Sequence, residues 1–427
     1  MTSDLAGWLG HIETLHPRAI ELGLDRVGAV RRALAADLSC PVITVGGTNG
    51  KGSTCAMLEA ILLAAGYRTG VYTSPHLLRY NERVRIDGRE VGDEQLAAAF
   101  SNVEAARSGV NLTYFEFGTL AAWDLFCRSA LDVVILEVGL GGRLDAVNLF
   151  DSDCAILTSV DLDHMEWLGD TREQIGFEKA HIFRDGRPAI CADPLPPQSV
   201  IDYADAIGAD LQRIGRDFGY QGDRQQWGFW GRGGKRAGLA YPALRGANQL
   251  LNASAALAAL DTLRARIPVG MNDVRKGLSL VELPGRFQVM PGRPVVVLDV
   301  AHNPHACAVL ADNLSNMGFA PNTFAVLGML RDKDMAGVVA RMAARVDRWH
   351  VATLEGPRGA TAGELARVLE YAGVKTPVLL FDSPRQAYAA ALGEAGENDR
   401  IVVFGSFLTV SNVMAARAAE PPQAHVR

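Results

Sequence analysis

A glycine-rich loop between a hydrophobic strand and a helix is the feature that most constrains this chain. Residues 41–54 read PVITVGGTNGKGST, and a helical pattern continues to residue 65. Backbone amides in such a loop cradle phosphate oxygens at a helix N-terminus. The glycines that would expose these amides are Gly46, Gly47, Gly50 and Gly52. Lys51 would reach the outer phosphates and Ser53 or Thr54 would meet a magnesium ion, so the loop predicts a nucleoside triphosphate site.

The loop departs from the common spelling G-x-x-x-x-G-K-[ST]. Val45 replaces the first glycine, and Gly52 separates Lys51 from the first hydroxyl. A glycine-rich turn is weak evidence by itself, because strand-to-helix turns need glycine for conformational reasons. The strand before the loop, the lysine at its tip and the helical run over 53–65 favour phosphate binding.

Length and composition set the broad class. At 427 residues the chain exceeds the size at which one hydrophobic core keeps growing, so two domains are expected. A formal net charge of −6 argues against a nucleic-acid or anionic-membrane partner. The first residues lack a signal-peptide pattern, and no apolar run reaches the roughly 20 residues of a membrane helix. The six cysteines are scattered without metal-binding spacing, which favours a cytoplasmic, reduced protein.

Short β-branched runs alternate with helical patterns, which predicts parallel sheets in an α/β fold. The expected strands are 42–45, 69–72, 133–138, 155–160 and 189–191, then 295–300, 324–327, 350–353, 378–381 and 401–404. Residues 211–241, rich in glycine and aromatics, fit a small antiparallel excursion, and 248–267 read as a helix. We therefore expect a phosphate-loop ATPase-type domain over 1–290 and a Rossmann-like domain over 291–427.

Polar residues mark several strand ends, where open α/β sheets bind ligands. Glu137 ends a buried-type strand and is costly there unless it is paired or binds a metal; the alternative is an ion pair with Arg143. His164 follows the next strand, although an imidazole is an atypical magnesium ligand. Ser74 follows another strand and could reach the same metal. In the second series, Asp299 and His302 could face ribose and phosphate, or be structural.

Nine motifs taken in order resemble the dihydrofolate synthase/folylpolyglutamate synthase family of the Mur ligase superfamily. They are GTNGKGST, TSPHLLRYNERVRIDG, LTYFEFGTL, LEVGLGGRLDAVN, DLDHMEWLG, EKAHIF, LPGRF, DVAHNP and GSFLTV. The match runs from about residue 8 to residue 412, close to the whole chain. It departs at Asn248, where the family has His, and at Val147, where the family has Thr.

The resemblance implies the chemistry of an ATP-dependent acid–amino-acid ligase. ATP phosphorylates a pterin-bearing carboxylic acid, the amine of L-glutamate attacks the acyl phosphate, and phosphate leaves. The implied substrates are dihydropteroate, reduced folates and L-glutamate. The implied cofactors are ATP, two Mg²⁺ ions and a carbamylated Lys179, and the resemblance allows a monovalent cation. A monomer is expected.

The resemblance also assigns residues. Asn49, Gly50, Lys51, Gly52 and Ser53 would hold the triphosphate, and Asn252, Arg286 and Asp299 would complete the ATP site from the far side, so that domain closure assembles it. Ser74, Glu137 and His164 look like magnesium ligands. The catalytic residues would be Lys51, Lys179 and His302. Pterin contacts would come from Thr14, Leu15, His16, Tyr114, Phe115, Glu116, Phe117, Leu144, Asp145 and Ala146.

Each of these assignments has a plainer alternative. The aromatic residues of LTYFEF could simply pack in the core, and Lys179 could be a surface cation.

Two other functions compete with that of a folate ligase. A cell-wall precursor ligase would need a nucleotide-recognition domain before the phosphate loop, where only about 40 residues are available, too few for a typical domain. A phosphate-loop switch or motor would hydrolyse ATP without an acid acceptor.

Overall fold

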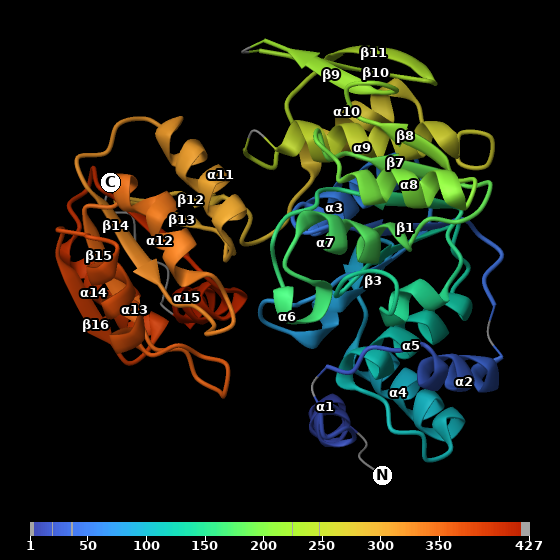
Figure 1. The fold of residues 1–427 in the computed structure, drawn as a ribbon, viewed down its shortest axis with the longest axis horizontal. Coiled ribbons are helices and arrows are strands. Elements are labelled where there is room, and N and C mark those ends of the chain that lie inside the picture. The colour runs from blue at the N-terminus through green and yellow to red at the C-terminus, as the bar shows by residue number, and fades with distance from the viewer. Residues whose placement is uncertain (1–3, 19, 36, 224, 247, 420–427) are drawn as a thin grey trace. The chain divides into compact units, whose positions relative to one another are not determined.

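The computed structural model describes residues 4–18, 20–35, 37–223, 225–246 and 248–419, and these fall into two compact units (Figure 1). Unit 1 comprises Met1–Ala243 and Gln249–Val281, and unit 2 comprises Leu244–Asn248 and Glu282–Arg427. The chain thus enters unit 2 briefly and returns to unit 1 before it leaves for good.

Unit 1 is built on an eight-stranded, mostly parallel sheet of the described residues. In spatial order its strands are β4 (Arg89–Glu90), β3 (Val84–Ile86), β2 (Thr69–Tyr72), β5 (Val133–Glu137), β1 (Val42–Gly46), β6 (Cys154–Leu157), β7 (Pro188–Cys191) and β8 (Asp210–Arg213). The five strands predicted for this part of the chain are confirmed within a few residues at their ends. Antiparallel β3 and β4 extend the sheet beyond β2 and were not predicted.

The predicted antiparallel excursion over 211–241 is correct only in part. Its first residues belong to β8, which pairs in parallel with β7 and extends the main sheet. The excursion proper is the three-stranded antiparallel sheet of β9 (Gly219–Gly222), β10 (Trp227–Gly231) and β11 (Gly234–Leu239). It packs beside α9 (Figure 1). Buried Trp227 donates its indole N–H to the Ala240 carbonyl at 2.9 Å. Trp227 is therefore a structural residue.

Helices cover both faces of the main sheet. One face carries α3 (Lys51–Ala64), α9 (Gln249–Thr262) and α10 (Met271–Leu280). The other carries α1 (Leu5–Thr14), α2 (Asp25–Leu34), α4 (Asp93–Arg107), α5 (Tyr114–Cys127), α7 (Arg172–Ala180) and α8 (Gln198–Ala206). Because β1 and β5 are covered on both faces, their side chains are buried throughout, as expected for a parallel sheet.

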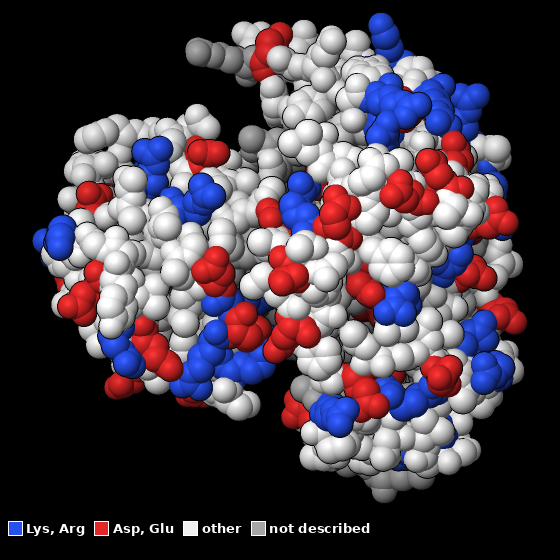
Figure 2. Space-filling view, in the orientation of Figure 1, with Lys and Arg blue, Asp and Glu red and all other residues white. Residues whose placement is uncertain are grey.

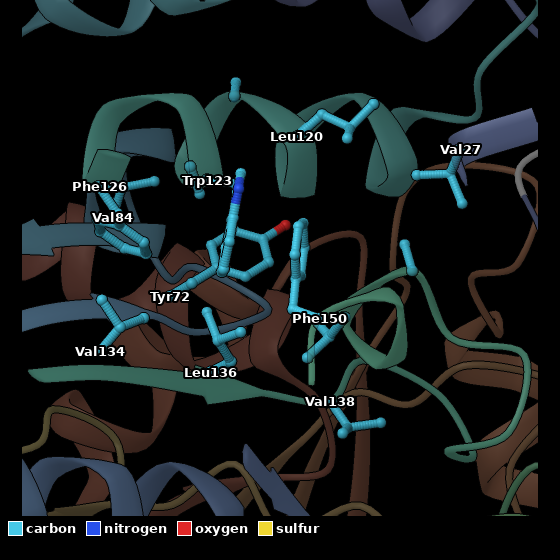
Figure 3. Packing of buried hydrophobic residues seen from close by; sticks show 14 of the residues in the cluster. Val27, Tyr72, Val84, Leu120, Trp123, Phe126, Val134, Leu136, Val138 and Phe150 are labelled. Atoms are coloured by element: carbon cyan, nitrogen blue, oxygen red, sulfur yellow. The ribbon is translucent and has the colours of Figure 1, made fainter. Parts of the chain in front are cut away.

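The helix α5 shows how sequence determines packing in this core. It begins at a capping box in which Thr113 and Glu116 each accept a hydrogen bond from the other's backbone amide, at 3.2 and 2.8 Å. Its apolar residues then face β5 and the 3₁₀ turn η2 (Ala146–Leu149). In Figure 3, Trp123 of α5 stacks on Phe150 with ring centroids 3.7 Å apart. The buried surface of α5 thus anchors the neighbouring loops to the sheet.

Unit 2 contains a six-stranded sheet, again counted over the described residues. Its order is β12 (Gln288–Met290), β13 (Val295–Leu298), β17 (Arg400–Phe404), β14 (Thr323–Leu327), β15 (Arg348–Ala352) and β16 (Val378–Phe381). The packed helices are α11 (Pro304–Ser315), α12 (Met335–Met342), α13 (Ala362–Tyr371), α14 (Pro384–Glu394) and α15 (Phe407–Ala419). All strands are parallel except β12, which was not predicted. The predicted fold class is confirmed.

Acidic and basic side chains are interspersed over much of the face seen in Figure 2. Several form ion pairs, such as Arg331 with Glu364 at 3.1 Å and Arg184 with Asp151 at 2.6 Å. Among the described residues, none of the helices has the length and apolar character needed to cross a membrane.

Two leucine-to-alanine substitutions test this description of the core of unit 1. Leu120 on α5 is completely buried, whereas Leu195 is 76% exposed. We expect Leu120→Ala to lower the free energy of unfolding by about 2–5 kcal/mol through lost contacts and a residual cavity. Leu195→Ala should change it by no more than about 0.5 kcal/mol. Chemical denaturation of both variants measures the difference, and equal effects would contradict the assigned core.

Candidate active site

Three strand ends converge at the carboxyl edge of the main sheet. Strand β1 lies between β5 and β6, with Val45 opposite Glu137 and Gly46 opposite Leu157. The loop that follows β1 therefore starts beside the ends of both neighbours. Ser74 follows β2, which is the next strand beyond β5. The glycine loop, Ser74 and Glu137 therefore lie at this edge, where α/β sheets bind ligands.

The glycine loop turns its carbonyl oxygens toward protein donors. The Gly46 carbonyl accepts from the Thr158 amide and hydroxyl, at 2.9 and 3.1 Å. The Asn49 carbonyl accepts from the hydroxyls of Thr158 and Ser159, at 2.7 and 3.1 Å. The Gly50 carbonyl accepts from the amide and hydroxyl of Thr54 in α3, at 2.9 and 3.0 Å. These carbonyls are thus already engaged by the protein.

Two lysines occupy the remaining carbonyls of the loop. The ammonium of Lys51 lies 3.1 Å from the Gly47 carbonyl and 3.4 Å from that of Thr48. The ammonium of Lys179 lies 3.2 Å from the same Gly47 carbonyl. Helix α3 starts at Lys51, and the first amides of a helix have no intrahelical acceptor. The amides at the start of α3, the engaged carbonyls and the ammonium of Lys51 together make this loop a site for anions.

Glycine is required at two positions of the loop. Gly47 has φ +140°, and a Cβ there would lie 1.9 Å from the Thr158 hydroxyl. Gly50 has φ +88°, and a Cβ there would lie 2.5 Å from Oδ1 of Asn252. Asn252, on α9, is therefore packed against the loop from within unit 1. The expectation that it approaches from the far side of the site is wrong.

Lys179 lies in the interior of unit 1. It is in the last turn of α7, and only 5% of the residue is exposed, so its reading as a surface cation is wrong. The turn at Gly142 permits the close approach of α7, because a Cβ there would lie 2.9 Å from the Lys179 carbonyl. The neighbouring Arg143 pairs with Glu178 at 2.9 Å. Its predicted alternative role as the partner of Glu137 is therefore wrong.

The three predicted magnesium ligands differ in how closely the structure joins them. The Ser74 amide donates to the Glu137 carboxylate at 3.1 Å, and Glu137 is buried at the end of β5. His164 precedes the short helix α6 (Met165–Leu168) with φ +52°, an uncommon conformation that functional sites often hold. Among the described residues, no three His, Cys, Asp or Glu side chains form a metal cluster. A site with few protein oxygens fits magnesium, which keeps water and phosphate ligands.

The predicted pterin-binding carboxylates already have protein partners. Buried Glu116 pairs with Arg26 at 2.9 Å and also accepts the Thr113 amide. Asp145 accepts the amides of Leu140 and Val147, at 2.7 and 2.9 Å. Burial raises the pKa of Asp145 to about 6, against the opposing effect of these amides and of the Lys51 charge. Both carboxylates therefore stabilise the local backbone, in addition to belonging to the set predicted to bind the pterin.

The aromatic residues of LTYFEF divide into core and surface. Phe117 is completely buried, with its ring 5.7 Å from that of Phe100, so it packs in the core and offers no face to a ligand here. Tyr114 and Phe115 are half-buried. A Cβ on Gly139 would lie 2.5 Å from the Phe115 ring, so the glycine makes room for that ring. Tyr114 and Phe115 remain candidates for contact with a flat heterocycle.

The segment before α2 links predicted pterin-binding residues that lie far apart in the sequence. Glu21, which was not predicted, lies 3.3 Å from His16 and 2.7 Å from Arg26, the partner of Glu116. The Gly23 amide donates to the Leu144 carbonyl at 3.5 Å. Thr14, by contrast, is exposed, and its hydroxyl donates to the His11 carbonyl at 2.9 Å. A buried glutamate in LTYFEF needs a cation, and that need was the available signal for Arg26.

A second unpredicted arginine lies beside Tyr114. The Arg83 guanidinium carbon is 5.5 Å from the centroid of the Tyr114 ring and 5.3 Å from that of Tyr80. Its Nε donates to Nδ1 of His76 at 2.8 Å. Burial, together with the Arg83 charge, lowers the pKa of His76 to about 4, so the imidazole is neutral and accepts this bond at pH 7. Arg83 thus brings a fixed positive charge to this region.

In unit 2, the motifs LPGRF and DVAHNP pair with each other. The Asp299 carboxylate accepts the amides of Phe287 and Ala301, at 2.9 and 2.8 Å. Burial raises the pKa of Asp299, and the charge of Arg286 opposes the rise. Arg286 lies over the ring of Phe407, 4.9 Å from its centroid, and the His302 ring centroid is 6.3 Å from the same ring. The three residues predicted in this unit are therefore brought together.

Comparison with known families defines the class of the chain. The model of the Mur ligase middle domain matches residues 45–260, and that of the Mur ligase glutamate ligase domain matches residues 285–407. The glycine loop lies inside the first match, and Arg286, Asp299 and His302 lie inside the second. The protein is an ATP-dependent acid–amino-acid ligase built from Mur ligase domains.

Individual relatives narrow the class further. The chain is 48% identical over 413 residues to the dihydrofolate synthase/folylpolyglutamate synthase of Escherichia coli (strain K12), covering 96% of this chain and 95% of that protein. It is 42% identical over 435 residues to the protein of the same name in Haemophilus influenzae, covering 97% and 98%. The chain belongs to the dihydrofolate synthase/folylpolyglutamate synthase family. The predicted resemblance is confirmed, and the cell-wall ligase and the switch or motor are set aside.

Solved structures agree with this assignment. The structure of E. coli FolC in complex with DHPP and ADP superposes with a TM-score of 0.92 at 47% identity, covering 98% of both chains. A bifunctional folylpolyglutamate synthase/dihydrofolate synthase with Mn, AMPPNP and L-glutamate bound gives a TM-score of 0.90 at 47% identity, with the same coverage.

Two glycine-to-alanine substitutions test the loop geometry. Gly47 and Gly66 both have positive φ, at +140° and +87°, but only at Gly47 would a Cβ collide with another residue. We expect Gly47→Ala to displace the loop from Thr158 and weaken ADP binding at least tenfold, on the order of 1.4 kcal/mol. Gly66→Ala introduces backbone strain without a collision and should leave ADP affinity unchanged. Isothermal titration with ADP and Mg²⁺ checks this, and similar affinities for both variants would refute the assigned loop.

Proposed function

We propose that this chain forms an amide between L-glutamate and the carboxylate of dihydropteroate, and adds further glutamates to reduced folates. A carboxylate oxygen takes the γ-phosphoryl group of ATP, which gives an acyl phosphate and ADP. The glutamate amine then attacks the carbonyl carbon, and inorganic phosphate and a proton leave. The observation that carries the proposal is the anion-binding loop at residues 46–53, in a chain that matches ligases of this name over almost its whole length.

The phosphate loop would hold the triphosphate through Asn49, Gly50, Lys51, Gly52 and Ser53. The positive charge of Lys51 would move from the Gly47 and Thr48 carbonyls to the outer phosphates, where it neutralises charge as the phosphoryl group transfers. Mg²⁺ at Ser74, Glu137 and His164 would supply further neutralisation of the phosphate oxygens. The proximity of Ser74 to Glu137 supports this set.

Other contacts to the nucleotide are proposed on both units. Asn252 lies against Gly50, which supports its assignment to the ATP site. Arg286 and Asp299 are proposed nucleotide contacts of unit 2, and His302 would act on the transferring phosphate. Arg286 and His302 both lie beside the Phe407 ring, and the charge of Arg286 acts on Asp299, which supports a shared role.

The pterin acid would bind near α5 and the loops beside it. The residues proposed are His16, Leu15, Tyr114, Phe115, Glu116, Leu144, Asp145 and Ala146, while the exposure of Thr14 and the burial of Phe117 argue for lesser roles. Because Arg83 faces Tyr114 and carries a charge, its position suits the carboxylate of the acceptor. We also propose that the protein acts in the cytoplasm as a monomer, with a monovalent cation as an additional cofactor.

An acceptor panel tests the proposed reaction. We expect phosphate release from ATP to require both L-glutamate and a pterin acid, either dihydropteroate or tetrahydrofolate. A UDP-linked sugar peptide should give no release above the background without acceptor. Lys51→Ala should abolish the release in every condition, because it removes the cation that meets the phosphates. Equal release with and without an acceptor would show a simple ATPase instead of a ligase.

We propose that Lys179 reacts with CO₂ to form a carbamate, with loss of one proton, and that the resulting anion orients a second Mg²⁺ ion. Burial of Lys179 supports this, since desolvation favours a neutral amine. The shared Gly47 carbonyl also supports it, because it brings the ammonium of Lys51 close and a second cation there is disfavoured.

Chemical rescue tests the role of Lys179. We expect Lys179→Ala to lose most ligase activity, and formate or acetate to restore part of it by supplying the missing carboxylate. Lys276→Ala is the control, because Lys276 is exposed on α10 and belongs to none of the site motifs. Initial rates of phosphate release measure both effects. A Lys179→Ala enzyme as active as Lys276→Ala would disprove the carbamate.

A further inference from the structure

The segment that follows β6 holds the glycine loop by its side chains as well as its backbone. Buried Thr158 shares its hydroxyl proton between the Gly46 and Asn49 carbonyls, at 3.1 and 2.7 Å. Ser159 donates to the Asn49 carbonyl and accepts the Asn49 amide, both at 3.1 Å. The Thr48 amide donates to the Ser159 carbonyl at 2.7 Å. The loop shape is therefore imposed from outside, by residues with no place in the phosphate-loop motif.

The direction of these bonds determines which way the loop amides point. In a trans peptide the C=O and the N–H lie on opposite edges of one plane. Since the Asn49 carbonyl points toward Thr158 and Ser159, the Gly50 amide in the same peptide points away from them. In the same way, the Gly46 carbonyl points toward Thr158, so the Gly47 amide in that peptide points away from it. Two amides of the loop are thus turned to the side opposite the hydroxyls.

We propose that Thr158 and Ser159 are positioning residues for the nucleotide, which orient the Gly50 amide toward the phosphates by holding the Asn49 carbonyl away from them. This inference rests on the proposed function of the loop. Without the two hydroxyls, the peptide between Asn49 and Gly50 is free to rotate, because glycine tolerates both signs of φ. Rotation would turn a carbonyl oxygen toward the triphosphate in place of an amide, and the two would repel each other.

The chain contains a matched control for the hydroxyl of Thr158. Thr44 lies on β1 and is 2% exposed, and its hydroxyl has no hydrogen-bond partner within the described part of the chain. Thr44→Val therefore removes a buried hydroxyl from the strand that leads into the loop without removing a loop contact. Thr158→Val removes the contacts, and Thr158→Ser keeps the hydroxyl while deleting a methyl group.

The test compares nucleotide affinity, acceptor affinity and stability in these variants. We expect Thr158→Val and Ser159→Ala each to weaken ADP binding in the presence of Mg²⁺ by roughly tenfold, and the double variant to weaken it further. Thr44→Val and Thr158→Ser should bind within about twofold of the unmodified chain, since each keeps the loop contacts. The KM for dihydropteroate and the melting temperature should change little in any of them. Titration calorimetry, initial rates and thermal melting supply the three readouts.

The possible results separate a failure of the nucleotide-binding function of the loop from a failure of the positioning role of Thr158 and Ser159. If the unmodified chain does not bind ADP with Mg²⁺, the proposed function of the loop fails. If it binds ADP and Thr158→Val behaves like Thr44→Val, the loop function stands and the positioning role is refuted. The role is also refuted if ADP affinity and the melting temperature fall while the KM for dihydropteroate rises, because that pattern is general destabilisation. A selective loss of ADP affinity, restored by Thr158→Ser, supports it.

Discussion

The hydrogen bonds between the segments 46–50 and 158–161 are the contacts on which the rest of the active site depends. They join the ends of β1 and β6. Two of them are reciprocal: the Thr48 hydroxyl donates to the Asp161 carbonyl and accepts a hydrogen bond from the Asp161 amide. His164 follows three residues later on the same segment. The shape of the phosphate loop and the position of a proposed metal ligand are therefore determined by one short stretch of backbone.

Electrostatics in unit 1 follow from the same arrangement. Buried carboxylates near the site each have compensating donors: Glu116 has Arg26, Asp145 has backbone amides, and Glu59 has Arg85 on β3. Lys51 instead donates to neutral acceptors, the Gly47 and Thr48 carbonyls of the phosphate loop, at 3.1 and 3.4 Å. A cation held beside the loop, with the neighbouring carboxylates already compensated, attracts a polyanion such as a triphosphate.

Much of this fold was predictable because its signals are local. The strands near β1, β5 and β14 are runs of buried β-branched residues, and the loop at Gly47 and Gly50 has a recognisable glycine pattern. What could not be predicted depends on tertiary partners. The parallel pairing of β8, the burial of Lys179 beneath the loop and the partnership of Arg26 with Glu116 leave no periodic trace in the sequence. Asn252 was identified through the family resemblance, but the side from which it approaches the loop follows from the packing of α9, which the resemblance did not indicate.

The interrupted course of unit 1 bears on how the protein folds as it leaves the ribosome. Helix α9 is buried along most of its length against α3 and the main sheet, yet it follows a short visit of the chain to unit 2. Unit 1 therefore cannot close its core when residue 243 emerges and must wait for residues 249–281. Because α9 also carries Asn252 to Gly50, the phosphate loop acquires its final surroundings only at that late point in synthesis. A nascent chain released earlier would expose the apolar face of α3 and invite capture by chaperones.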